Sequence, residues 1–163
     1  MKSAIEYRKY ESPDGLTIQL PELIFESIQR QVAKYYPREC GGIFVGRVVG
    51  SAAVIQQIMM PKTFYSTPIF FRRMASLVNR WLSRVFKQSE GETIYLGEWH
   101  SHPNGIPIPS ITDFTTMKKI AEYEGVRIKT PILMIVGYDG NTYAETFYLF
   151  NYNKLVHYHK INQ

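Results

Sequence analysis

The sequence predicts a single domain of the α/β class, mixed and α+β-like, in which a mixed β-sheet packs against helices. Its 163 residues, 45% of them hydrophobic and 20% charged, suit one domain with its own core. Segments with the apolar periodicity of helices mix with short apolar segments typical of strands, without strict alternation. No repeat, low-complexity tract or linker divides the sequence, so we treat residues 1–163 as one domain.

The expected elements follow in order along the chain. Residues 20–36 have apolar side chains near helical spacing, with Pro21 suited to a first helical turn and Pro37 ending the helix. Two apolar segments joined by a turn at Gly50 and Ser51 predict a hairpin over residues 42–60. The other expected elements are a helix over 68–88, a strand over 93–100, a helix between Ser110 and Gly125, strands over 131–139 and 142–152, and an edge strand within 154–161.

Composition restricts the compartment and the partners. No apolar run approaches the roughly 20 residues that span a bilayer, and the polar start has no signal-peptide pattern, so we expect a cytoplasmic protein without membrane contact. The single cysteine, Cys40, excludes an internal disulfide and a multi-thiolate metal site. A net charge of +5 suggests an acidic partner or nucleic acid. The basic residues form no aromatic-interleaved patch, so we consider nucleic acid unlikely.

The segment GEWHSHPNGIPIPSITDF carries the clearest chemical signal. His100 and His102 are two residues apart at the end of an apolar strand, so both imidazoles point to the same face. Pro103 ends the strand, and the proline-rich loop after it is stiff enough to bring Asp113 back towards the histidines. Two histidines and an aspartate suit Zn²⁺ and leave a fourth position for water.

Each of these residues also has a structural explanation. Ser110 and Asp113 have the spacing of a helix capping box, and a strand-end histidine is usually not a ligand. The combination of all four residues favours a metal site. We expect that Asp113 cannot complete the cap while it faces a metal, and that the metal prevails.

A metal-bound water needs a base that takes its proton. Glu39, in YPRECGGIFVG, lies between the first helix and the hairpin, and the two glycines after Cys40 would allow close approach of backbone or substrate. Glu98 shares the strand face of the two histidines and remains an alternative base.

The sequence contains Glu39, the stretch GGIFVG and His-Ser-His-Pro, followed after six residues by Ser110 and after two more residues by Asp113. This pattern resembles the JAMM (JAB/MPN+) zinc metallopeptidases. This resemblance implies a mixed sheet between helices, with His100, His102 and Asp113 binding one Zn²⁺ per chain. It also implies that Glu39 activates the water, that Ser110 stabilises the oxyanion, and that the substrate is an amide or isopeptide bond after a ubiquitin-like tail.

Among JAMM proteins the sequence looks similar to stand-alone bacterial members, in particular the deconjugating peptidases of CBASS antiphage operons. That resemblance implies a cyclic-nucleotide synthase as the conjugated protein and an E1–E2-like conjugation protein as a further partner. Removal or maturation of another ubiquitin-like or sulfur-carrier protein is an alternative. A non-catalytic binding scaffold with this fold is a second alternative.

Four other features have possible roles. Cys40 could be a nucleophile with a histidine base, although packing explains it equally well. His157 and His159 repeat the His-x-His spacing, and we expect them on an exposed edge strand. The arginines of the 68–88 helix predict a solvated face or, less simply, a docking surface for an acidic partner. The stretches 62–68 and 104–109 are expected to hold an extended substrate tail that has a small residue before the scissile bond.

Overall fold

The computed structural model describes residues 4–60 and 69–161, and for residues 69–77 it describes the backbone only. Three helices and nine strands occur in these ranges. The helices are α1 (Glu22–Tyr35), α2 (Ile69–Gln88) and α3 (Ile111–Glu122). The strands are β1 (Tyr7–Glu11), β2 (Thr17–Pro21), β3 (Gly41–Val49), β4 (Ala52–Met59), β5 (Ile94–Pro103), β6 (Ile132–Tyr138), β7 (Tyr143–Asn151), β8 (Lys154–His157) and β9 (His159–Ile161).

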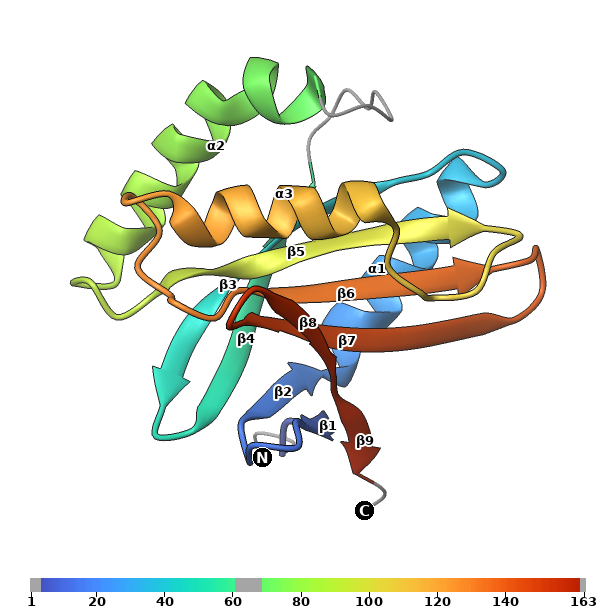
Figure 1. The fold of residues 1–163 in the computed structure, drawn as a ribbon, viewed down its shortest axis with the longest axis horizontal. Helices are drawn as coiled ribbons and strands as arrows, with labels where there is room; N and C mark the ends of the chain where they lie inside the picture. The colour runs from blue at the N-terminus through green and yellow to red at the C-terminus, as the bar shows by residue number, and fades with distance from the viewer. Residues whose placement is uncertain (1–3, 61–68, 162–163) are drawn as a thin grey trace.

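The strands form one mixed sheet in the order β8-β7-β6-β5-β3-β4-β2-β1-β9. The pairs β5–β6 and β2–β4 are parallel and the other pairs are antiparallel. Figure 1 shows α3 in front of this sheet, α1 behind it and α2 beside β5. The predicted class, a mixed sheet between helices, is confirmed.

Strand β6 shows how the two faces of the sheet are covered. Ile132, Met134 and Val136 belong to the larger core, which also contains the buried residues of α1. Leu133 and Ile135 alternate with them and pack with Met117 of α3. Because side chains alternate across a strand, α1 and α3 cover opposite faces of the sheet.

Most of the predicted elements are present. The first helix, the hairpin, the third helix and strands β6 and β7 lie within a few residues of their predicted bounds. The helix predicted over 68–88 is α2, although part of its predicted apolar stripe falls on side chains outside the described residues. The predicted substrate-holding stretch 62–68 also lies outside them.

The prediction of an edge strand within 154–161 is confirmed, but the segment supplies an edge strand at both ends of the sheet. The segment forms two short strands: β8 pairs with β7, and β9 pairs with β1 at the other end of the sheet. The break falls at Tyr158, which is buried and whose backbone N–H donates to the carbonyl of Phe147. Burial of this ring in the core separates the two strands, because an uninterrupted strand would keep pairing with a single neighbour.

Candidate metal centre

Strand β5 carries two histidines on one face of the sheet. In the parallel register with β6, His100 lies beside Ile135 and His102 beside Gly137, so both side chains lie on the face that α3 covers. Their Nε2 atoms are 3.0 Å apart. The predicted convergence of the two imidazoles is therefore present, and β5 continues past the predicted end at His100 to Pro103, which pairs with Tyr138.

The start of β5 needs a glycine to reach this arrangement. Gly97 has φ 157°, and a Cβ atom there would lie 1.9 Å from the carbonyl oxygen of Ile132. Gly41 has the same role for His100, because a Cβ atom on Gly41 would meet the Trp99 carbonyl oxygen at 2.4 Å and the His100 Cβ at 3.0 Å. The sequence predicted that backbone or substrate would approach the glycines after Cys40 closely. At Gly41 the group that approaches is strand β5.

The loop between β5 and α3 is held in place by hydrogen bonds at several points. The backbone N–H of Asn104 donates to the Tyr138 carbonyl over 2.8 Å, and the Tyr148 hydroxyl donates to the Pro107 carbonyl over 2.8 Å. The Tyr36 hydroxyl donates to the Asn104 side chain over 2.7 Å. These contacts with α1, β6 and β7 explain why the loop returns to the sheet, as its prolines predicted.

Asp113, in the first turn of α3, completes a three-residue group with the two histidines. Its Oδ1 lies 3.2 Å from Nε2 of His100, and its Oδ2 lies 3.8 Å from Nε2 of His102. The three ligand atoms all lie within 4.8 Å of one another, and each side chain is partly buried. Among the described residues this is the one group of three or more metal-ligating side chains that lie so close together.

The nitrogen of His102 that faces away from the group has its own partner. Nδ1 lies 3.1 Å from the carbonyl oxygen of Ile106. A carbonyl oxygen can only accept, so Nδ1 carries the proton and Nε2 presents its lone pair towards His100 and Asp113. This tautomer is the one in which Nε2 binds a metal, and the outer hydrogen bond fixes the orientation of the ring.

Asp113 also completes a capping box with Ser110. The Ser110 backbone N–H and hydroxyl donate to Asp113 Oδ2 over 2.7 and 2.8 Å, and the Asp113 backbone N–H donates back to the Ser110 hydroxyl over 3.1 Å. The expectation that capping and facing the metal site exclude each other was wrong. A carboxylate has two oxygens, and here Oδ2 caps the helix while Oδ1 is the oxygen closer to His100.

The surroundings of Asp113 keep its side chain ionised. Burial raises the pKa of this carboxyl, but hydrogen bonds and charge from His100 and hydrogen bonds from Ser110 outweigh burial and lower the pKa to about 2. An ionised carboxylate beside two imidazoles is a donor set that suits Zn²⁺, so the residues fit the metal that the sequence predicted.

Glu39 lies just before β3, and its side chain is exposed. Strands β3 and β5 pair Gly41 with His100, and the backbone N–H of Ser101 donates to the Cys40 carbonyl over 2.7 Å. Continuing the antiparallel register by two residues from the Gly41–His100 pair puts Glu39 across from His102, on the same side of the sheet.

Glu98 has a different environment. It is 7% exposed, and its carboxylate accepts a hydrogen bond from the Tyr95 hydroxyl. Burial raises the pKa of the Glu98 carboxyl to about 8, although the Tyr95 hydrogen bond lowers it. The sequence indicated that Glu98 shares the face of the histidines, which the pairing of Glu98 with Leu133 confirms, but it contained no signal for Tyr95 as a partner.

Cys40 is fully buried, and burial raises the pKa of its thiol. A buried, protonated thiol is a poor nucleophile, so the cysteine-peptidase alternative receives no support. His157 and His159 are both exposed, with their ring centroids 4.8 Å apart. In the ranges that the structure describes, they are not part of any group with three potential ligands.

The helices on both faces of the mixed sheet and the His-His-Asp group are those of a hydrolase of the JAMM class. Residues 21–150 match the family described as prokaryotic homologs of the JAB domain, and the chain belongs to that family. Within residues 4–60 and 69–161, none of the helices has the length and apolar content needed to cross a membrane.

Three known proteins are similar to the chain. A CD-NTase/cGAS isopeptidase of Enterobacter hormaechei is 28% identical over 131 residues, covering 76% of this chain and 68% of the relative. A probable metalloprotease of Sinorhizobium fredii is 27% identical over 124 residues, covering 73% of this chain and 74% of the relative. The solution structure of a Desulfitobacterium hafniense protein superposes with a TM-score of 0.60 at 15% identity, covering 83% of this chain and 86% of the other, and supports the fold alone.

Proposed function

We propose that this protein is a zinc-dependent isopeptidase that releases a CD-NTase, a cyclic-nucleotide synthase, from proteins to which its C-terminal tail has been joined. The observation that carries the proposal is the convergence of His100, His102 and Asp113 at the end of a central strand. The name of the Enterobacter relative supports the substrate, and the proposed biological role is reversal of E1–E2-type conjugation in antiphage defence.

His100, His102 and Asp113 would hold the zinc through two nitrogens and one carboxylate oxygen. When bound, the ion supplies Lewis-acid chemistry, which lowers the pKa of a water and polarises the scissile carbonyl. The Ile106 carbonyl holds the His102 ring, and the Ser110 hydrogen bonds hold the Asp113 carboxylate. These two contacts fix the directions of the ligand atoms before any metal binds.

Glu39 would be the general base that takes a proton from the attacking water and passes it to the leaving amine. Its exposure, together with the register that puts it across from His102, supports this role. Glu98 is buried and hydrogen-bonded to Tyr95, so it has neither the access to water nor the freedom that a proton shuttle requires.

Ser110 would donate a hydrogen bond to the oxyanion of the tetrahedral intermediate. In the structure its hydroxyl donates to Asp113 Oδ2 over 2.8 Å. Rotation about one side-chain bond would redirect that hydroxyl towards the substrate. The Ser110 backbone N–H would continue to hold Asp113, because that hydrogen bond does not involve the hydroxyl.

The loop over residues 104–109 would hold the substrate tail. Ile106 and Ile108 of this loop are 67% and 56% exposed, although the Ile106 carbonyl also contacts the His102 ring. A loop held by hydrogen bonds to α1, β6 and β7 loses little conformational freedom when a peptide binds it. Two exposed apolar side chains so near the ligands therefore suit an extended tail that approaches the metal.

The test is cleavage of a CD-NTase from the same genome, fused through its C-terminus to a reporter protein. Purified protein should contain about one zinc per chain by mass spectrometry and should cut the fusion at the last CD-NTase residue. Cleavage of a ubiquitin-like or sulfur-carrier fusion in its place would identify the alternative substrate class. Bound zinc without cleavage of any such fusion would contradict the proposal and favour a binding scaffold.

A further inference from the structure

The excess positive charge of this chain is concentrated in one helix. Helix α2 contains five basic residues and no acidic one. The whole chain has 19 basic and 14 acidic residues, so the chain outside α2 has 14 of each and no net charge. The formal net charge of +5 therefore belongs to α2 alone, although along the sequence the basic residues had seemed dispersed.

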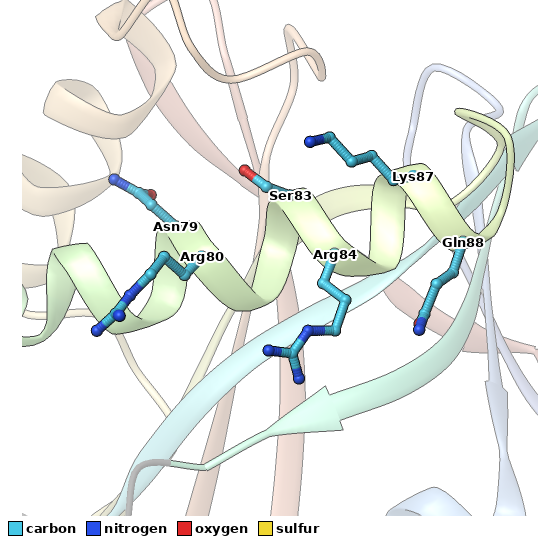
Figure 2. Close-up of a pocket in the computed structure, with 6 residues that line it drawn as sticks. All are labelled: Asn79, Arg80, Ser83, Arg84, Lys87 and Gln88. Atoms are coloured by element: carbon cyan, nitrogen blue, oxygen red, sulfur yellow. The ribbon is translucent and has the colours of Figure 1, made fainter.

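The described half of α2 presents a polar and basic surface. Trp81, Leu82, Val85 and Phe86 are half-buried, while the exposed positions between them line a shallow pocket. Those exposed residues are Asn79, Arg80, Ser83, Arg84, Lys87 and Gln88. Figure 2 shows Arg80 and Arg84 pointing to the same side of the helix and Lys87 pointing to the other.

Some of the described cations are paired with carboxylates, whereas others, including Lys34 and Arg38 as well as those of α2, are not. Arg8, Arg30, Arg47, Lys118 and Lys160 each lie within 4.0 Å of a carboxylate. Across the part of the chain that the structure describes, Arg80, Arg84 and Lys87 have no such neighbour. Arg80 and Arg84 are four residues apart, so their like charges slightly destabilise the helix. Nothing among the described residues offsets this repulsion.

We infer that the exposed face of α2 binds an acidic surface of the folded part of the substrate protein. Exposed charges of one sign steer a partner of opposite charge and raise its association rate. A protein is favoured over nucleic acid because the residues between the cations are Asn79, Ser83 and Gln88, which provide no aromatic surface on which bases could stack. This inference rests on the proposed function.

The position of α2 relative to the metal centre suits a folded domain with a tail. Helix α2 ends at Gln88, and β5 begins shortly afterwards at Ile94. At about 3.3 Å per residue, β5 extends roughly 26 Å from Ile94 to His102. A domain bound at the end of α2 would therefore reach the metal through an extended tail of about eight residues, and a short peptide around the scissile bond would not contact α2.

The experiment compares two matched pairs of substitutions. Arg80→Gln with Arg84→Gln removes two exposed cations four residues apart on α2. Arg30→Gln with Lys34→Gln removes two exposed cations at the same spacing on α1, which covers the other face of the sheet. Each protein also carries Glu39→Ala, so that association with the uncut CD-NTase–reporter fusion can be measured by biolayer interferometry at low and high salt.

We call the Arg80→Gln/Arg84→Gln variant the α2 pair and the Arg30→Gln/Lys34→Gln variant the α1 pair. We expect the α2 pair to lower the association rate about fivefold at low salt and to reduce the salt dependence of that rate. Its melting temperature should not fall. The α1 pair should leave both quantities unchanged. Equal association rates for the two pairs would overturn the inference. So would binding of an oligonucleotide, measured by fluorescence anisotropy, that only the α2 pair abolishes, because nucleic acid would then be the partner.

Cleavage by the variants that retain Glu39 separates this inference from the proposed function. The α2 pair should raise KM for the folded fusion and leave cleavage of a short peptide around the scissile bond unchanged. If the unaltered protein does not cleave the fusion but binds it through α2, the proposed function fails and the docking surface stands. If the unaltered protein cleaves it and the α2 pair behaves like the α1 pair, only the docking surface fails.

Discussion

The backbone N–H of Cys40 donates to the side-chain hydroxyl of Ser101 over 2.9 Å, inside the protein. Ser101 is 1% exposed and lies between the two histidines, and Cys40 follows Glu39 directly. The hydroxyl of one residue thus connects the strand that carries two of the proposed metal ligands to the segment that carries the proposed base. The Ser101 backbone N–H reinforces this link by donating to the Cys40 carbonyl over 2.7 Å.

Ser101→Ala should lower kcat about tenfold without loss of zinc, because Cys40, next to Glu39, loses both contacts with the Ser101 hydroxyl and keeps only the backbone hydrogen bond. The variant should also be less stable, since a buried backbone N–H without an acceptor costs about 1–3 kcal/mol. Ser101→Thr keeps the hydroxyl and should recover most of kcat. An unchanged kcat in the alanine variant would show that Glu39 does not depend on this contact.

Glu39→Ala should abolish cleavage and retain zinc, because Glu39 acts on the water and is not a ligand. Cleavage rate and metal content are measured on the same preparation. Glu98→Gln is the control, since glutamine keeps the size of the buried side chain and its hydrogen bond with Tyr95. If Glu98→Gln alone eliminates activity, the assignment of the base must be reversed.

Two substitutions can separate the proposed metal-binding role of Asp113 from its capping of α3. Asp113→Ala and Asp113→Asn should both lose zinc, but only alanine removes the acceptor of the Ser110 hydrogen bonds. With a chelator present, Asp113→Ala should be less stable than the wild type by about 1 kcal/mol. Asp113→Asn should be more stable than Asp113→Ala, because asparagine keeps an acceptor for the Ser110 hydrogen bonds. Without a chelator, bound zinc should raise the melting temperature of the wild type alone. A wild-type melting temperature that does not respond to the chelator would refute that last expectation.

Cleavage should require a small residue, glycine or alanine, immediately before the scissile bond, because we propose that the substrate tail approaches the metal along the loop over 104–109. Replacing it with leucine or tryptophan in the fusion should lower kcat/KM at least about tenfold, or roughly 1.4 kcal/mol. Equal rates across the series would show that no constriction exists there.

Ile106→Ser with Ile108→Ser should raise KM for the same fusion several-fold at constant zinc content, because apolar surface that contacts the tail is lost. Ile5→Ser is the matched control, since Ile5 is 65% exposed against 67% for Ile106 and precedes β1, four strands from β5. A similar change of KM in both proteins would indicate a general effect of surface polarity.

Stability below neutral pH should depend on Glu22. A hydrogen bond from Arg8 lowers the pKa of this carboxyl below the ordinary value of 4.5, although its partial burial raises it. The stabilising contribution is therefore complete above about pH 4.5 and is lost as the pH falls through the pKa of the folded protein. Glu22→Gln should flatten the dependence of urea unfolding on pH in this range. Glu26→Gln, whose exposed partner Arg30 lies 3.8 Å away, should leave that dependence as it is.

The sequence predicted the arrangement of the metal ligands because their positions follow from local rules. His100 and His102 share a face because strand side chains alternate, and Asp113 returns because the prolines after Pro103 make a stiff loop. Spacing alone could not predict that Asp113 both caps α3 and faces the histidines. This depends on the orientation of the carboxylate, in which Oδ2 accepts from Ser110 and Oδ1 lies nearer His100. The division of residues 154–161 into β8 and β9 could not be predicted from the sequence either. It depends on the burial of Tyr158 in the core, among residues distant in the sequence. The charge of α2, by contrast, was visible in the sequence and became informative only once Arg80, Arg84 and Lys87 were seen to be exposed.

Residues 154–161 pair with β7 through β8 and with β1 through β9, so one short segment covers two strands that would otherwise present unpaired backbone N–H and C=O groups to solvent. Exposed strand edges of this kind recruit other chains and lead to strand exchange or aggregation. Loss of this segment would uncover both edges in a single event. Solubility would then fail before the proposed metal ligands on β5 were disturbed.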